Sequence, residues 1–141
     1  MQKILIINGP NLNLLGTRKP EVYGSMTLNQ LVDELTQFAQ KKGCDIEHFQ
    51  SNHEGAIIDV LHDTLNKSYI GCLINAGAFT HYSYAIRDAI EAIPTPCIEV
   101  HLSDIEKRED FRKISVITEV CSKQFKGMGI DSYKKAIEAL V

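Results

Sequence analysis

Residues 4–24 read ILIINGPNLNLLGTRKPEVYG, and this stretch decides the fold. The four apolar residues 4–7 stop at the polar and turn-forming residues 8–18, and Tyr23 and Gly24 follow shortly after. A continuous apolar run bounded by turn residues is typical of a strand covered on both faces, as in a parallel sheet. Ligands of open α/β sheets bind beyond the carboxyl ends of such strands. The stretch therefore predicts a buried strand that delivers amide, guanidinium and phenol groups to a functional site.

Strand-like runs and helix-like periods alternate along the rest of the chain. The expected strands span residues 3–7, 45–49, 70–75, 97–101 and 122–126, and the expected helices span residues 27–42, 54–66, 84–92 and 132–140. Alternation of this kind indicates a parallel sheet with crossover helices. We expect a single flavodoxin-like domain over residues 1–141, an α/β three-layer sandwich with a five-stranded parallel sheet of order 2-1-3-4-5.

Local signals mark the ends of two of these helices. Thr27 and Gln30 predict a capping box at the start of the first long helix, and Gly43 offers a cap at its end. Asp131 or Ser132 is expected to cap the last helix.

The composition excludes several classes of function. A chain of 141 residues with 44% hydrophobic and 23% charged residues is typical of one globular domain. A formal net charge of −3, without a Lys/Arg stripe, argues against a nucleic-acid partner. The four cysteines are widely spaced, so we expect core thiols and neither disulfides nor zinc ligands. No apolar stretch reaches the roughly 18 residues that span a bilayer, and no signal-peptide pattern is present, so we expect a cytoplasmic protein without a membrane partner.

Polar side chains gather at the predicted carboxyl ends of three strands. Asn8 and Asn11 follow the first strand, Asn75 ends the third, and Glu99 and His101 end the fourth. Residues two apart in a strand point to the same side, so the Glu99 carboxylate can hold the His101 imidazole and favour its protonated form. His101 is then a candidate general acid. The alternative is a hydrogen-bonded strand end without a chemical role.

The segment between Gly16 and Gly24 holds Arg18 and Tyr23, and its glycines together with Pro20 indicate a loop that can close as a lid. A guanidinium near a phenol favours the phenolate, although ionising a tyrosine near neutral pH means offsetting roughly 4 kcal/mol. Arg18 and Tyr23 are therefore candidates for a catalytic base and its activator. A packing or cation–π contact is the alternative interpretation.

Residues 75–83 turn from strand to helix, where exposed amides, hydroxyls and a helix amino terminus suit a small, oxygen-rich anion. Asp88 lies seven residues after His81, on about the same helical face, and is either a surface residue or a group that reaches a site. The mixed charges of residues 105–110 indicate a solvated helical turn, from which Arg112 can face inward to pair with a carboxylate.

His48, His53 and His62 show no ligand spacing with carboxylates or cysteines, so we expect neither a metal nor another cofactor.

Five stretches of the chain, taken in order, resemble the type II 3-dehydroquinate dehydratases. They are NGPNLNLLGTRKPEVYG at 8–24, FQSNHEG at 49–55, NAGAFTH at 75–81, IEVHLS at 98–103 and REDFR at 108–112. The resemblance covers the whole chain. It implies a flavodoxin-like fold, a homo-oligomer of trimers assembled into a homododecamer, and anti dehydration of 3-dehydroquinate in the shikimate pathway of aromatic amino acid biosynthesis.

The resemblance also implies roles for five catalytic residues. Tyr23 is the base that removes a proton from the carbon next to the ketone, and Arg18 keeps it ionised and holds the lid. Asn11 stabilises the enolate through a bound water. His101, oriented by Glu99, protonates the departing hydroxyl to give 3-dehydroshikimate, without a metal or a Schiff base.

Further residues are implied to bind the substrate's hydroxyls and carboxylate. These are Asn75, His81, Arg112 and the backbone at Leu102 and Ser103, with Asp88 reaching a neighbouring subunit's site. Lys19, Ala76, Lys113 and Ile114 depart from the commonest family form, and none of them is a proposed catalytic group.

The sequence admits two other interpretations of this fold. A flavin carrier needs a phosphate loop rich in Ser, Thr and Gly, and a phosphoacceptor receiver needs an acidic cluster after the first strand, whereas residues 8–11 read NGPN. An assembly subunit without activity would keep the fold and lose the chemistry, and activity measurements separate it from an enzyme.

Overall fold

The computed structural model describes residues 1–17 and 20–141, with residues 22 and 23 described by their backbone alone. Its sheet has five parallel strands in the order β2-β1-β3-β4-β5, which confirms the predicted topology. The strands are β1 Gln2–Asn8, β2 Cys44–Gln50, β3 Tyr69–Asn75, β4 Cys97–Val100 and β5 Lys123–Phe125. The α-helices are α1 Pro20–Tyr23, α2 Leu28–Gln40, α3 Glu54–Asp63, α4 Tyr84–Ala92 and α5 Ile130–Leu140.

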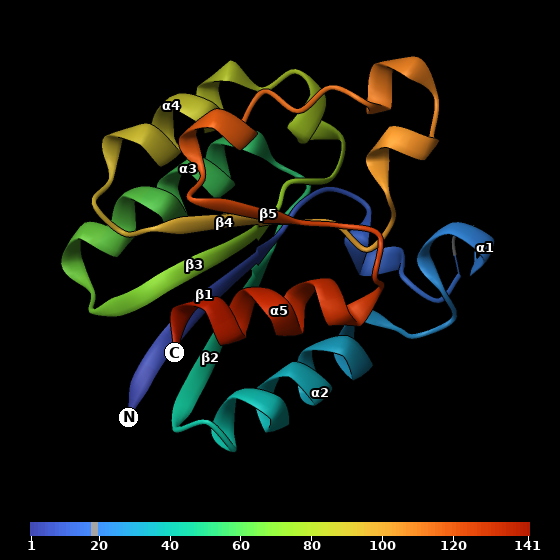
Figure 1. Ribbon diagram of the computed structural model, residues 1–141. Helices are drawn as coiled ribbons and strands as arrows, with labels where there is room; N and C mark the ends of the chain where they lie inside the picture. Colours follow the sequence, from blue (N-terminus) through green and yellow to red (C-terminus); the bar gives the residue numbers. More distant parts are fainter. Residues whose placement is uncertain (18–19) are drawn as a thin grey trace.

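Helices cover both faces of the sheet, with α2 and α5 on one face and α3 and α4 on the other (Figure 1). Strand β1 alternates between the two resulting cores. Ile4 and Ile6 pack into the core under α2 and α5, whereas Leu5 and Ile7 pack into the core under α3 and α4. The apolar run that opens the chain is therefore continuous because both of its faces are buried.

Some predicted helix ends are confirmed and others are wrong. The capping box of α2 is present: the Gln30 N–H donates to the Thr27 hydroxyl at 3.2 Å, and the Thr27 N–H donates to the Gln30 side chain at 3.0 Å. The predicted cap of the last helix is wrong, because α5 begins at Ile130 after Gly129, which has no capping side chain. The Ser132 hydroxyl instead accepts from the Met128 N–H, folding the preceding turn back onto the helix.

Two other boundaries shift slightly. The second long helix ends at Asp63 and continues as a 3-10 turn, Thr64–Asn66, rather than as one helix to residue 66. Strand β4 ends at Val100, although the His101 N–H still donates to the Phe125 carbonyl at 3.0 Å. His101 therefore sits at the point where β4 leaves the sheet, with its backbone still held.

The loops after β1 and β3 pack tightly against each other. The Gly9 N–H donates to the Asn75 carbonyl at 2.7 Å, and a Cβ on Gly9 would lie 2.5 Å from the Ala76 carbonyl oxygen. Only glycine fits that approach. Both termini lie at the opposite end of the sheet from these loops (Figure 1).

Within residues 1–17 and 20–141, none of the helices is both long and apolar enough to cross a membrane.

Candidate active site

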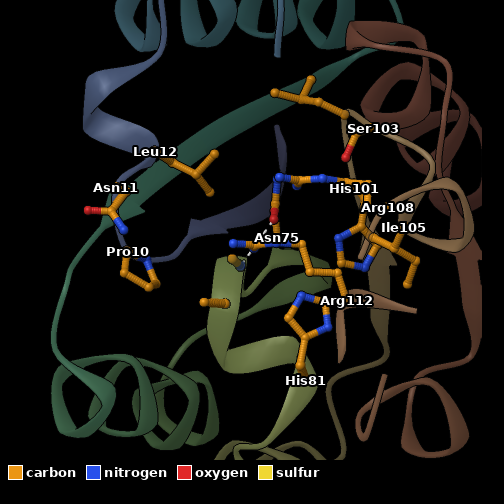
Figure 2. Close-up of a pocket in the computed structure, with 13 residues that line it drawn as sticks. Pro10, Asn11, Leu12, Asn75, His81, His101, Ser103, Ile105, Arg108 and Arg112 are labelled. Atoms are coloured by element: carbon orange, nitrogen blue, oxygen red, sulfur yellow. Dashed lines mark hydrogen bonds between the residues drawn. The ribbon is translucent and has the colours of Figure 1, made fainter. Parts of the chain in front are cut away.

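A cavity of about 170 Å³ opens at the carboxyl ends of the strands. Figure 2 shows the side chains around it, which come from segments far apart in the sequence. The residues that line it are Pro10, Asn11, Leu12, Asn75, Gly77, Ala78, His81, His101, Leu102, Ser103, Ile105, Arg108 and Arg112. Seven predicted site residues therefore come together: Asn11, Asn75, His81, His101, Leu102, Ser103 and Arg112.

Asn11 enters the cavity rim in a strained backbone conformation. Its φ is 68°, and it is the one residue other than glycine with a positive φ in the described part of the chain. Asparagine tolerates this left-handed region better than most residues. The Asn52 side chain accepts from the Asn11 N–H at 3.0 Å, so the loop that follows β2 holds the loop that follows β1. Sequence reasoning missed Asn52, although it lies in the stretch 49–55.

Asn75 lies at the end of β3 and is 5% exposed. Its amide oxygen accepts from the Gly77 N–H at 3.2 Å, and its amide nitrogen donates to the Tyr133 hydroxyl at 2.9 Å. The amide is thereby fixed in one orientation under the cavity. Tyr133 lies buried in α5, and the apolar periodicity expected for a helix over residues 132–140 does not indicate a polar contact there.

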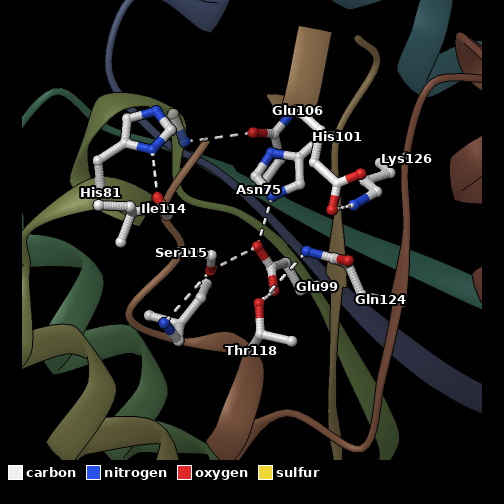
Figure 3. Close-up of polar contacts among 12 residues, drawn as sticks. Asn75, His81, Glu99, His101, Glu106, Ile114, Ser115, Thr118, Gln124 and Lys126 are labelled. Atoms are coloured by element: carbon white, nitrogen blue, oxygen red, sulfur yellow. Dashed lines mark hydrogen bonds and ion pairs between the residues drawn. The ribbon is translucent and has the colours of Figure 1, made fainter. Parts of the chain in front are cut away.

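Glu99 and His101 form the hydrogen-bonded pair that their spacing predicted. The His101 Nε2 and Glu99 Oε2 atoms are 2.6 Å apart, and neither residue is more than 5% exposed. Two hydroxyls also donate to the carboxylate, Ser115 to Oε2 at 2.8 Å and Thr118 to Oε1 at 2.5 Å (Figure 3). No spacing in the sequence indicated these two donors, because they follow Glu99 by 16 and 19 residues.

Burial is the strongest influence on the Glu99 carboxyl and favours its neutral form, but the three hydrogen bonds and the charge of His101 together outweigh it. The pKa of Glu99 is consequently lowered from its ordinary value. An ionised carboxylate can only accept, so the proton between the two groups belongs to His101 Nε2. His101 Nδ1 is then the ring nitrogen left for a ligand in the cavity.

His81 is fixed by the loop that follows the predicted charged turn. Its Nδ1 lies 2.7 Å from the Ile114 carbonyl oxygen, which can only accept, so Nδ1 carries a proton. Burial is the main cause that lowers the pKa of His81, and the charges of His101, Arg112 and Arg108 act in the same direction against the bond to Ile114. Neutral His81 therefore presents Nε2 as a hydrogen-bond acceptor.

Arg112 faces inward, as the sequence predicted, and pairs with a carboxylate. Its Nε donates to Glu109 Oε2 at 2.8 Å, and its guanidinium carbon lies 4.6 Å from the centre of the Phe111 ring. The predicted solvated turn at 105–110 is wrong in part: Ile105 is 5% exposed, and Arg108 lines the cavity. The mixed charges of this segment indicated solvent exposure throughout, so these two inward-facing residues were not predicted.

The described lining side chains include two arginines and two histidines and no carboxylate. Amide groups from Asn11 and Asn75 complete the polar wall (Figure 2). Such a wall suits a small anion that also carries hydroxyl groups. In the part of the chain that the structure describes, no group of three or more His, Cys, Asp or Glu side chains is arranged to hold a metal ion.

Glu99 reaches the cavity through His101, and three further predicted site residues are not among the described lining residues. Asp88 lies on the exposed side of α4 and is absent from the described lining. Arg18 lies outside the described residues. Tyr23 ends α1, but its side chain lies outside the description, so its role stays a prediction.

The residues that depart from the family pattern do not disturb these contacts. Ala76 is buried against Gly9, and Lys113 pairs with Asp110 at 3.2 Å. Ile114 serves His81 through its backbone carbonyl, which any residue supplies. Lys19 lies outside the described residues.

Comparison with known proteins gives one consistent result. The model of a family described as dehydroquinase class II matches residues 2–141. A 3-dehydroquinate dehydratase from Bacillus pumilus is 52% identical over 141 residues, which are all of this chain and 95% of the relative. One from Caldicellulosiruptor saccharolyticus is 53% identical over 140 residues, covering 99% and 97% of the two chains. The crystal structure of a type II dehydroquinase from Butyrivibrio crossotus is 46% identical, covers 99% of this chain and 97% of that one, and superimposes with a TM-score of 0.97.

Proposed function

This chain belongs to the class II dehydroquinase family, and we propose that its cavity is the site at which 3-dehydroquinate is dehydrated to 3-dehydroshikimate. The protein is thus a 3-dehydroquinate dehydratase, a lyase of the shikimate pathway. The single observation that carries the assignment to this cavity is the buried Glu99–His101 pair, which opens into a wall of cationic and amide groups.

His101 is the general acid of the proposed reaction. Glu99 holds Nε2, so a protonated His101 donates from Nδ1 to the hydroxyl that leaves. The carbon–oxygen bond breaks as that proton arrives, and the oxygen departs as water. Because the carboxylate is held by three donors, it stays ionised and keeps the imidazole in one orientation.

Tyr23 is the proposed base, and Arg18 is the proposed group that keeps it ionised. The phenolate takes the proton from the carbon next to the ketone, which leaves an enolate whose electrons then expel the hydroxyl. Asn11 stabilises the enolate oxygen through a bound water, and its strained backbone is consistent with a preorganised role. Anti elimination follows when the base and His101 act on opposite sides of the substrate.

The remaining lining groups are assigned to substrate binding. The amide of Asn75 and the acceptor nitrogen of His81 suit hydroxyl groups, and Arg112 adds a cation for charge balance. The carbonyls of Leu102 and Ser103 accept from Gly129 and Gly127, at 3.0 Å and 3.2 Å. Those bonds fix the loop by its carbonyls, and its N–H groups are the proposed donors to the substrate carboxylate.

We further propose that residues 1–141 act as one catalytic domain in the cytoplasm and that trimers assemble into a homododecamer. In that assembly the exposed side of α4 brings Asp88 to the site of a neighbouring subunit. The proposal predicts that Asp88→Ala weakens both substrate binding and trimer contacts. Unchanged sedimentation and unchanged binding would count against it.

Ultraviolet absorbance of the enone formed from 3-dehydroquinate tests the reaction directly. Turnover by the wild-type protein is expected to resist both a chelator and pretreatment with borohydride, since the proposed chemistry uses neither a metal nor an imine. Absence of turnover by folded protein would instead favour a binding or assembly role.

Two substitutions test the assigned residues, and a third serves as a control. His101→Ala is expected to lower kcat by about 10²- to 10⁴-fold, the usual contribution of general acid catalysis, whereas the exposed His62→Ala on α3 is the matched control. Tyr23→Phe should abolish turnover while largely preserving binding of the substrate. Near wild-type turnover would exclude Tyr23 as the base.

A further inference from the structure

Four polar side chains form a connected run beneath the cavity, on the face of the sheet that α2 and α5 cover. His48 comes from β2, Asn8 from β1, Tyr133 from α5 and Asn75 from β3. The Asn8 Nδ2 atom is 2.9 Å from His48 Nε2, the Tyr133 hydroxyl is 2.5 Å from Asn8 Oδ1, and the Asn75 Nδ2 atom is 2.9 Å from the same hydroxyl. Asn8 and Tyr133 are 0% exposed.

The direction of hydrogen-bond donation along this run is determined at its cavity end. The Asn75 oxygen accepts from the Gly77 N–H, so its nitrogen is the atom that faces Tyr133 and donates to the hydroxyl. A hydroxyl has one proton, so Tyr133 donates to the Asn8 oxygen. Burial raises the pKa of Tyr133 against the opposing effect of Asn75, which keeps that proton on the ring oxygen.

The other end of the run agrees with this polarity. With its oxygen used by Tyr133, Asn8 donates from nitrogen to His48 Nε2, which must then be unprotonated. Burial lowers the pKa of His48, which favours the neutral ring that this bond requires. All four groups therefore have compatible donor and acceptor roles, in one direction from Gly77 to His48.

We propose that Tyr133, anchored through Asn8 to His48, is a positioning residue that holds the Asn75 amide so that its second N–H points to a substrate oxygen in the cavity. This inference rests on the proposed function, since it concerns how that substrate is bound. Asn75 Nδ2 has two protons, and Tyr133 uses one of them. If the tyrosine hydroxyl is lost, the bond from the Gly77 N–H is the one of these two contacts that remains on the amide, so its second N–H is held less firmly toward the substrate hydroxyl.

A purely structural role is the competing explanation. The same hydrogen bonds brace α5 against β1 and β3, so losing them must lower stability in either case. Stability alone cannot separate the two roles. Measurements of KM can separate them, because a purely structural role would not affect KM specifically through Asn75.

Tyr133→Phe removes the hydroxyl while keeping the ring. It is expected to raise KM for 3-dehydroquinate by about two- to twelvefold, the effect of one hydrogen bond, with kcat and its pH profile unchanged. Tyr69→Phe is the matched control. Tyr69 begins β3, the strand that ends at Asn75, and its hydroxyl donates to Glu47 at the far end of the sheet. That variant should leave KM and kcat at wild-type values.

A double-mutant cycle makes the test specific. In an Asn75→Ala background, Tyr133→Phe should have no further effect on KM, because the group that it positions is absent. An unchanged KM in the single variant, or fully additive effects in the double variant, would overturn the proposal and leave the structural brace.

Neutron diffraction from crystals of the deuterium-exchanged wild-type protein gives a test that needs no variant. Deuterium is expected on the Tyr133 oxygen toward Asn8 and on His48 Nδ1, with Nε2 bare. The opposite amide orientation at Asn75 would overturn the inference even if the variants fail to fold. A wild-type protein without dehydratase turnover would instead refute the proposed function, and the neutron map would still test the polarity of the run.

Discussion

Replacing Thr118 by valine removes one hydroxyl from the group that holds Glu99 and leaves the shape of the side chain almost unchanged. Among the hydrogen bonds that the described residues make to this carboxylate, those from His101 and Ser115 reach Oε2, and the bond from Thr118 at 2.5 Å is the one at Oε1. Gln124 in turn donates to the Thr118 hydroxyl at 3.3 Å (Figure 3). Thr118→Val therefore exposes Oε1 to an apolar methyl group while Glu99 remains buried.

The expected loss in the free energy of unfolding at neutral pH is about 1.5–3 kcal/mol, the range for a hydrogen bond to a charged group. The sign of the pH dependence follows from Glu99, whose pKa in the native protein lies below its ordinary value of 4.5. Such a group stabilises the fold above that value, and this contribution is lost as the pH falls through the lowered native pKa. Removing a donor raises the pKa of Glu99. The difference in the free energy of unfolding between wild type and variant is therefore largest near neutral pH and decreases in acid.

The pH dependence of kcat/KM should change for the same reason. A carboxylate that protonates more readily releases His101 at a higher pH, so the acid limb of the kcat/KM profile is expected to move to higher pH in Thr118→Val. Thr118→Ser keeps the hydroxyl and should restore the profile.

Urea unfolding at several pH values, with all proteins at equal concentration, and the pH dependence of enone formation measure the two effects. Thr36→Val is the matched control, because the Thr36 hydroxyl donates to the Val32 carbonyl within α2, at 2.8 Å and away from the cavity. A variant with wild-type stability at neutral pH and a superimposable kcat/KM profile would refute the assigned role of Thr118.

Three further outcomes are expected. Gly9→Ala would place a Cβ 2.5 Å from the Ala76 carbonyl oxygen, so it should lower the free energy of unfolding by ~1–3 kcal/mol and reduce turnover. A variant with wild-type stability in urea unfolding and wild-type activity in the enone assay would contradict this contact. A hydrogen bond with Cys97 and burial raise the pKa of Cys72, and burial raises the pKa of Cys121. Both thiols should therefore react slowly with a disulfide reagent until urea unfolds the protein. Rapid labelling of either cysteine in the native protein, located by mass spectrometry, would contradict this. His81 is neutral above its ordinary pKa of 6.5 because burial lowers its pKa, so titration of His81 should leave KM unchanged between about pH 7 and 8, and KM that rises there in the wild type but not in His81→Gln would indicate a charged imidazole.

The sheet and its order could be predicted because β1 and β3 have sequences that admit one interpretation. Their last five residues are all buried, and a run that is buried on both faces belongs in a parallel sheet. The alternation of these runs with amphipathic helices then leaves few topologies. The start of α5 could not be predicted in the same way, because Ser132 satisfies the Met128 N–H of the turn before the helix rather than a helical N–H.

The candidate site could be predicted in part for a related reason. Parallel strands place their carboxyl ends at one edge, so polar residues at those ends had to meet, and the Glu99–His101 contact follows from a spacing of two. Contacts between distant segments carry no such periodicity. Thr118, Ser115 and Tyr133 reach the site from elements whose spacing describes only how they pack, and their roles depend on tertiary structure.

Strands β3 and β4 place their polar end groups on opposite faces of the sheet. Asn75 turns toward α5, where a neutral run of amide, phenol and imidazole holds it, whereas Glu99 lies on the face of α3 and α4 with hydroxyl donors. This division has a chemical consequence. A neutral run can fix an amide without adding a charge, and a carboxylate held by hydroxyl donors stays ionised and can orient an imidazole without a competing cation. The sheet thus separates binding from proton transfer, and we expect Tyr133→Phe to act on KM and Thr118→Val to act on the pH dependence of turnover, each with little effect on the other.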